Sequence, residues 1–125
     1  MQQEQSTSRV TVLALDRWGS ILVSKEGPPW TWLQRDESPD TGALRIFEEA
    51  TGTLLEELHL FHHGEPSHHV YYCDPDLEVA DLSPPPGMSL HYISPVEIDV
   101  ATFPNEARSL LTKFVISTAY RAMFH

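Results

Sequence analysis

The chain has 125 residues, of which 18 are acidic and 8 basic, and a formal net charge of −10 at pH 7. That length allows one domain with a hydrophobic core and is too short for two ordinary domains. The charge excludes non-specific binding to DNA or RNA, because nothing neutralises a phosphate backbone, and it makes an anionic ligand harder to attract.

The sequence predicts a cytoplasmic protein that does not contact membranes. Its single cysteine, Cys73, cannot form an internal disulfide and lies in no motif typical of a nucleophile. The first residues, MQQEQSTSR, lack the basic and then apolar order of a signal peptide. No apolar run reaches the length that spans a bilayer.

The N-terminal third of the chain predicts three short strands. Residues 1–8 are polar and predict a flexible N-terminus, followed by a single domain over 9–125. The apolar runs VTVLALD (10–16) and ILVSKE (21–26) flank the turn-like RWGS and predict a hairpin. The aromatic run WTWL (30–33) predicts a short strand at a sheet edge.

A helix is predicted over about residues 39–51. Ser38 followed by Pro39 is typical of a helix start, and Gly52 is typical of a helix end. Its apolar side is expected to comprise Leu44, Phe47 and either Leu54 or Leu55.

The remaining elements complete an α+β domain. HLFHH (59–63) and HHVYYC (68–73) predict two antiparallel strands around the turn GEPS. SPPPG (83–87) predicts an irregular loop, because three successive prolines do not fit a central strand. SLHYISP (89–95) predicts another short strand, and helical spacing of apolar residues predicts a C-terminal helix over about 105–124.

The stretch DESPDTGALRIFEEATG (36–52) resembles the signature of the Nudix family. In both, a glutamate is followed by seven residues and an arginine, here Glu37 and Arg45, and Gly52 falls at the final glycine of the signature. The second half, from HVYYCDPDLEVADL through PGMSLHYISPVEI, is also similar to that of small Nudix proteins. The resemblance implies a Nudix-type α/β/α sandwich with a mixed β-sheet.

The resemblance also implies a chemistry, the hydrolysis of a nucleoside diphosphate linked to another group (NDP-X) with magnesium or manganese. The family holds these ions with carboxylates on one face of the signature helix, at positions that share a face because they are three or four residues apart. Here that face reads Ile46, Glu49 and Ala50. Glu49 is therefore the one candidate catalytic carboxylate and metal ligand on it, and a single exposed carboxylate binds magnesium poorly.

Two further parts of the family's site are changed. The glycine-rich loop before the helix is missing, since the chain runs from WTWL through QR directly to DES. A metal-binding acid of a later loop falls near Pro86, so Asp76, Glu78 or Asp81 would have to replace it.

The matching residues, by contrast, are those expected to hold the structure together. Glu37 and Arg45 are expected to form a partly buried ion pair, and Gly52 a left-handed helix cap. In an alternative register, shifted by one residue, Glu48 and Glu49 become the adjacent metal-binding pair, and the spacing between Glu37 and Arg45 is lost.

Histidines and aromatic residues provide other candidate sites. Five of the seven histidines lie close together, namely His59, His62, His63, His68 and His69. They could bind zinc or nickel across a hairpin, or they could form an exposed tip that titrates near neutral pH.

Four residues are candidates for contacting a substrate, namely Lys25, Arg35, Trp30 and Trp32. We expect the two tryptophans to face opposite sides of their strand, so that one could stack on a nucleobase. The aromatic edge also favours a homodimer.

Three hypotheses follow. The first is a Nudix-fold protein with a degenerate signature, in which hydrolysis is lost or strongly impaired and the domain is kept for ligand binding, regulation or assembly, with a nucleotide-type small molecule as partner and no cofactor. The second is an active NDP-X hydrolase that uses magnesium or manganese, bound by Glu49 with Glu48 or an acid from 74–81. The third is a metal-binding or pH-sensing histidine module.

Overall fold

The computed structural model of the protein describes residues 8–62 and 64–124. The predicted flexible N-terminus therefore lies outside the described residues except for Ser8, whose carbonyl accepts a hydrogen bond from the Leu33 N–H (2.9 Å). In chain order the elements are β1 (Arg9–Ala14), β2 (Ile21–Val23), β3 (Trp30–Trp32), α1 (Pro39–Thr51), β4 (His59–Phe61), β5 (His68–Cys73), the 3-10 helix η1 (Val79–Asp81), β6 (His91–Ile93), the 3-10 helix η2 (Pro95–Glu97), α2 (Asn105–Val115) and α3 (Thr118–Met123).

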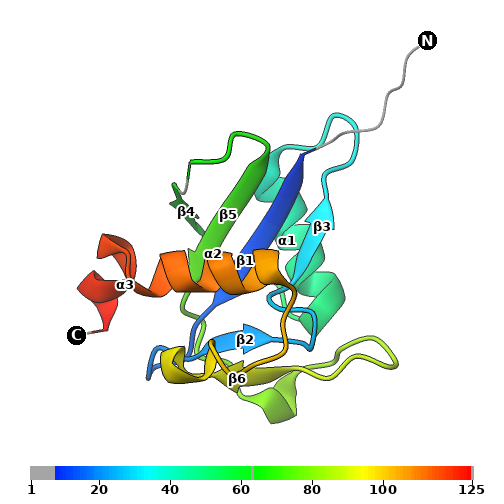
Figure 1. Ribbon diagram of the computed structural model, residues 1–125. Helices are drawn as coiled ribbons and strands as arrows, with labels where there is room; N and C mark the ends of the chain where they lie inside the picture. The colour runs from blue at the N-terminus through cyan, green and yellow to red at the C-terminus, as the bar shows by residue number, and fades with distance from the viewer. Residues whose placement is uncertain (1–7, 63, 125) are drawn as a thin grey trace.

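The strands form a mixed sheet and a smaller second sheet (Figure 1). The larger sheet has the order β3-β1-β5-β4, in which β1 is parallel to β5 and antiparallel to β3. β4 and β5 are antiparallel, as predicted from the two histidine-containing runs, and β3 lies at the predicted edge. The second sheet pairs β2 with β6.

The predicted hairpin between the first two strands is wrong. The chain does turn between Leu15 and Ile21, which form an isolated antiparallel bridge, but β1 and β2 then enter different sheets. Every residue of β1 after Arg9 is buried. A strand that is buried on both faces is a central strand, and β1 accordingly has neighbours, β3 and β5, along both of its edges.

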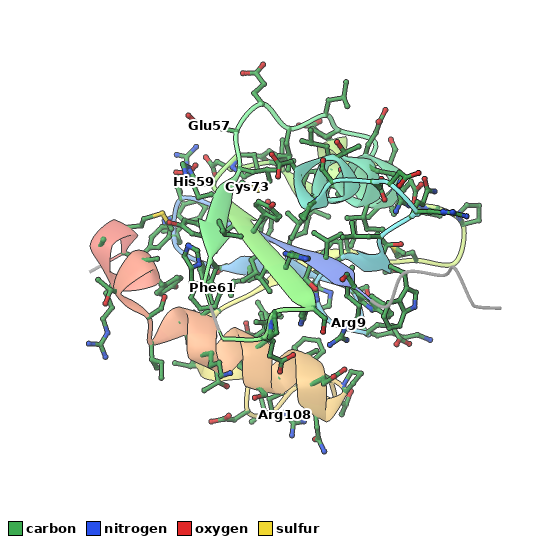
Figure 2. All side chains as sticks on the ribbon, turned by 90° about the horizontal axis from the view of Figure 1, so that it is seen from above. Arg9, Glu57, His59, Phe61, Cys73 and Arg108 are labelled. Atoms are coloured by element: carbon green, nitrogen blue, oxygen red, sulfur yellow. The ribbon has the colours of Figure 1, made fainter. Side chains whose placement is uncertain are left out.

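Two helices cover the opposite faces of the sheet (Figures 1 and 2). Side chains alternate along β1, so that Val12 packs in one core cluster with Phe47 of α1, whereas Leu13 packs in another with Phe114 of α2. All four side chains are fully buried. The α/β/α sandwich is therefore confirmed.

α1 has the predicted bounds. The Ser38 hydroxyl accepts a hydrogen bond from the Thr41 N–H (3.3 Å), and Pro39 is the first helical residue. At the other end Gly52 adopts φ 78°, a left-handed conformation that favours glycine, and its N–H donates to the Glu48 carbonyl. A Cβ at Gly52 would also lie 3.0 Å from that of Ser83.

The apolar side of α1 agrees with the prediction at Phe47 and at Leu55, which packs against the core below α1, and differs from it at Leu44. The buried residues include Ala43, Phe47 and Ala50, whereas Leu44 is only partly buried and Leu54 is 68% exposed. The helix is thus oriented so that Ala43 and Phe47, not Leu44, pack in the core with β1.

The predicted C-terminal helix is divided into two. α2 ends at Val115, and the Ser117 hydroxyl donates to the Phe114 carbonyl (2.6 Å) and accepts from the Tyr120 N–H (3.2 Å). A serine that caps a new helix competes with continuation of the old one. α3 turns back to the body of the molecule, where the Tyr120 hydroxyl donates to the Gly19 carbonyl (2.6 Å).

Candidate functional site

Glu37 and Arg45 form a two-pronged ion pair at the start of α1. The Arg45 Nε and Nη2 atoms lie 2.8 Å and 2.9 Å from the two carboxylate oxygens of Glu37, whose side chain is only 7% exposed. The carboxylate also accepts a hydrogen bond from the Gln34 N–H (2.8 Å). The expected ion pair is present, and so is the register that places Arg45 opposite Glu37; the register shifted by one residue is not adopted.

This pair has an electrostatic and a structural consequence. The hydrogen bonds from Arg45 hold the pKa of Glu37 below its usual value, and Glu37 in turn raises the pKa of Arg45. Arg45 also donates to the Trp32 carbonyl (3.0 Å), so it joins the helix to the edge strand β3. In the short loop between them, Asp36 adopts φ 65° without a glycine.

The helix face that resembles a metal site is largely closed. Ala50 is 3% exposed, and Ile46 packs against the core cluster that contains Ala43 and Phe47. The segment after β5 crosses the end of the helix, where the Ser83 N–H donates to the Thr51 carbonyl (2.8 Å). Leu77 and Leu82 of this segment pack against the same cluster.

The residues present do not fit a magnesium or manganese site. Glu49 is exposed, and its carboxylate lies 3.6 Å from Arg45 Nη1, while the neighbouring Glu48 is also exposed. Across residues 8–62 and 64–124, no group of three or more histidine, cysteine, aspartate or glutamate side chains is placed to hold a metal ion. Hard divalent cations need several oxygen ligands, and a lone surface carboxylate does not supply them.

The acids of the loop after β5 have other positions. Asp76 accepts hydrogen bonds from the Arg17 backbone N–H and side chain, each at 3.0 Å. Glu78 and Asp81 are exposed in and beside the 3-10 helix η1.

The histidines are distributed over β4, β5 and the turn between them. His59 stacks against Tyr72 with ring centroids 5.2 Å apart, whereas His62 and His69 line a shallow hollow beside the turn. His63 lies outside the described residues. His68 points to β1, where its Nε2 atom lies 2.7 Å from the Thr11 hydroxyl. Among the described residues, these histidines therefore form no cluster that could hold a metal ion, as the metal-binding hypothesis requires.

A cavity of about 210 Å³ lies between the sheet and α2, and we call it the sheet–α2 pocket. It is lined by residues from four strand and helix elements, including Arg9, Thr11, Trp30, His68, Glu106 and Leu110. Because Thr11 and Leu13 share one face of β1, the pocket lies on the side of the sheet opposite α1. Figure 2 shows Arg9 at the end of the sheet that faces α2.

Arg9 holds the pocket wall together. Its Nη1 and Nη2 atoms donate to the two carboxylate oxygens of Glu106 at 3.0 Å and 3.2 Å. Its guanidinium carbon lies 5.7 Å from the ring centroid of Trp30 and 5.8 Å from that of Trp32, within cation–π range. The guanidinium hydrogen bonds and charge also lower the pKa of Glu106.

The two tryptophans face the same side of β3, so the expectation that they face opposite sides is wrong. Their ring centroids are 5.5 Å apart in an edge-to-face arrangement. The side-chain period of a strand is two residues, which places residues 30 and 32 on one face. They stand directly opposite Thr11 and Arg9 of β1.

The floor of the pocket is an ordered polar pair. Arg9 Nη2 lies 3.4 Å from His68 Nδ1. A guanidinium only donates, so Nδ1 is the ring nitrogen that accepts from Arg9, and Nε2 lies 2.7 Å from the Thr11 hydroxyl. Thr11 is 3% exposed, so this pair fixes the position of His68 inside the pocket.

The structure places some of the predicted substrate contacts at this pocket and others elsewhere. Trp30 lines the sheet–α2 pocket, and Trp32 lies beside it. Lys25 lies in the turn after β2, and Arg35 lies in the loop before α1; neither lines this pocket. Arg9 and Glu106 were missed, because they are separated by 97 residues and belong to no motif.

Cys73 is not a nucleophile. Its side chain is buried in the core cluster below α1, and burial raises the pKa of its thiol to about 12. A thiol with such a pKa is protonated at neutral pH and unreactive.

Comparison with known proteins identifies the fold. No protein-family model and no curated protein matches the sequence. Among solved structures, the chain is similar to a protein from Chromobacterium violaceum described as a nudix hydrolase family member, with a TM-score of 0.73 and 19% identity over 98% of this chain and 88% of that one. It is similar to a MutT protein from Aliivibrio salmonicida or Vibrio cholerae, with a TM-score of 0.74 and 15% identity over 88% and 96% of the two chains.

A MutT protein from Methanosarcina mazei is also similar, with a TM-score of 0.62 and 19% identity over 91% of this chain and 96% of that one. At these identities the likeness concerns the fold, and the chain has the fold of Nudix hydrolases. Within the described residues, no helix combines the length and apolar character needed to cross a membrane.

Proposed function

We propose that this chain is a Nudix-fold domain in which metal-dependent hydrolysis of NDP-X compounds is lost or strongly impaired, and which serves to bind a small molecule. Such a domain needs neither magnesium nor manganese. It would act by taking up its ligand, in regulation or in assembly with other molecules.

The observation that carries this proposal is the closed face of α1. The signature position occupied by Ala50 is buried, and Ile46 contributes to the core instead of presenting an oxygen to solvent. The one carboxylate of that face, Glu49, lies next to Arg45, whose positive charge opposes the approach of a cation. The ion pair between Glu37 and Arg45 is nevertheless present, so the proposal keeps the structural role of the signature and not its metal binding.

The sheet–α2 pocket supports the ligand-binding part of the proposal. It combines an aromatic wall at Trp30 with ordered polar groups at Thr11 and His68, the mixture typical of small-molecule sites. A nucleotide-type molecule is one candidate ligand, because the indole ring of Trp30 offers a surface on which a base can stack.

Product release from candidate substrates tests the proposal. The wild-type protein would be incubated with nucleoside triphosphates, dinucleoside polyphosphates, ADP-ribose and NDP-sugars, with magnesium and separately with manganese. We expect no turnover above that of a Glu49→Gln variant prepared in parallel, since Glu49 is the one carboxylate on the relevant helix face.

A Glu57→Gln variant serves as the matched control, because it removes the same charge from an exposed residue outside α1. Turnover that disappears in Glu49→Gln and persists in Glu57→Gln would show that a metal site has been rebuilt around Glu49. The active NDP-X hydrolase would then be the correct reading, and the proposal would be wrong.

A further inference from the structure

The lining of the sheet–α2 pocket is acidic, which is unusual for a fold whose enzymes act on phosphates. Three glutamates from separate parts of the chain line it, namely Glu26 after β2, Glu65 before β5 and Glu106 in α2. The basic residues of its lining are Arg9 and Lys113. The lining is thus acidic overall when His68 is neutral, in a chain whose net charge is −10.

The positive charge of Arg9 is already compensated. Both of its terminal nitrogens donate to the Glu106 carboxylate, at 3.0 Å and 3.2 Å, and its side chain is only 20% exposed. An anion entering the pocket would have to break this pair before it could bind the guanidinium. The N-terminus of α2, which would otherwise attract an anion, has Glu106 in its first turn.

The pocket wall already accommodates one planar cation. The Arg9 guanidinium lies over the rings of Trp30 and Trp32 and is paired with a carboxylate at its edge. This combination of an indole face and a carboxylate is the environment that stabilises a guanidinium, an amidinium or an amine. Trp30 remains 40% exposed and lines the cavity, so it can contact a second such group.

The size of the cavity limits what enters it. At about 210 Å³ it is smaller than the pockets that enclose a drug-sized ligand, which are roughly 300–1,000 Å³. It therefore fits one head group, with the rest of the ligand outside.

From these observations we propose that the sheet–α2 pocket receives the cationic head of a small molecule, of the amidinium, guanidinium or amine type, between Trp30 and the carboxylates of Glu26 and Glu65, and that it disfavours phosphate and carboxylate groups. The inference rests on the proposed function, because it takes the pocket to be the ligand site. It narrows that function from a small molecule of any kind to one with a positively charged end, and it places any phosphate group of a nucleotide-type ligand outside the pocket.

Three probes of nearly equal shape test the charge preference. Benzamidine is cationic at pH 7, benzamide is neutral and benzoate is anionic, while all carry the same ring. Each would be titrated into the full chain, and binding would be followed by heteronuclear NMR at the Trp30 indole N–H and the Ala107 amide. Probes of this size are expected to bind in the millimolar range.

We expect benzamidine to bind at least about fivefold more tightly than benzoate, with benzamide between them, since one additional favourable charge contact at a partly exposed site has roughly that effect. Raising the salt concentration should narrow the difference, because ions screen exposed charges. The double variant Glu26→Gln/Glu65→Gln should reduce the preference to about twofold or less.

The matched control is Glu56→Gln/Glu57→Gln, which changes the net charge by the same amount at exposed residues that do not line the pocket. It should retain the wild-type preference. If this control lost the preference as well, the effect would come from the overall charge, and the inference about Glu26 and Glu65 would be wrong.

The remaining outcomes separate the inference from the function on which it rests. Binding of benzoate at Trp30 as tightly as benzamidine would overturn the charge preference and leave the pocket as a ligand site. If no probe changed the NMR signals of the Trp30 indole N–H or the Ala107 amide, the pocket would not be a ligand site, and the inference would be wrong. Turnover that depends on Glu49 would overturn the proposed loss of hydrolysis without affecting the charge preference.

Discussion

At the scale of single residues, the burial of position 50 is the feature of α1 on which the proposed function depends most. Ala50 is 3% exposed, and the partly buried Ile46 of the same helix packs against the core below α1. An alanine is readily buried here, whereas a glutamate would bring a negative charge to a position shielded from solvent. Under the proposed function, a buried alanine at this position both removes a candidate metal ligand and closes this part of the helix face.

Replacing Ala50 by glutamate should for that reason destabilise the protein before it restores any metal binding. We expect Ala50→Glu to lower the free energy of unfolding by about 3 kcal/mol or more, measured by urea denaturation. Leu54→Glu, which places the same charge at a residue 68% exposed just beyond the helix, should change it by less than about 0.5 kcal/mol. An Ala50→Glu variant of wild-type stability whose melting temperature rises with magnesium would show that the face opens readily.

At the scale of elements, the loop, helix and edge strand around α1 behave as one clamp. Arg45 contacts the Glu37 carboxylate and the Trp32 carbonyl, so it links the loop before the helix to β3. At the other end of the helix the Ser83 N–H donates to the Thr51 carbonyl. These contacts are all made by protein groups, so the residues that match the signature, Glu37 and Arg45, have a structural role in this fold.

The clamp should make stability depend on pH. Glu37 has a folded pKa below the ordinary value of 4.5, so its ion pair stabilises the folded state above that pH, and the contribution is lost as pH falls through the folded pKa. We expect Glu37→Gln to cost about 2 kcal/mol at pH 7. The difference from wild type should shrink below about pH 4.5.

Urea denaturation at a series of pH values measures this difference, with Glu48→Gln as the control for an exposed glutamate of α1. A difference between Glu37→Gln and wild type that stays constant from pH 7 to low pH would contradict an ionic origin of the clamp.

At the scale of the whole molecule, the homodimer expected from the aromatic edge stays a prediction, and the structure limits its form. The Trp32 carbonyl points away from β1 and already accepts a hydrogen bond from Arg45, so a second copy cannot extend the sheet through that atom without displacing Arg45. The Trp32 side chain, 52% exposed, is then the contact to test.

We expect Trp32→Thr to shift the mass measured by light scattering from a dimer to a monomer, because an aromatic residue at an interface buries about 150–250 Å². Trp18→Thr removes a tryptophan that is 74% exposed in the turn after β1, and it should leave the mass unchanged. A wild-type protein that is monomeric at every concentration would refute the prediction.

The sequence by itself determined the features that depend on near neighbours. The bounds of α1 follow from Ser38, Pro39 and Gly52, because caps satisfy the backbone groups of the helix ends locally. The spacing of Glu37 and Arg45 sufficed to predict their ion pair. Even the shared face of Trp30 and Trp32 was available from the period of a strand.

Only the tertiary structure decided which segments meet across the fold. The apolar runs of β1 and β2 are compatible both with a hairpin and with separate sheets. In the fold β1 is a buried central strand of the larger sheet, and β2 belongs to the smaller one. The burial of Ala50 and Phe47 depends on how α1 packs in the fold, which no local pattern specifies. The sheet–α2 pocket depends on Arg9 and Glu106, which no local pattern connects, because long-range pairs form only when the layers pack.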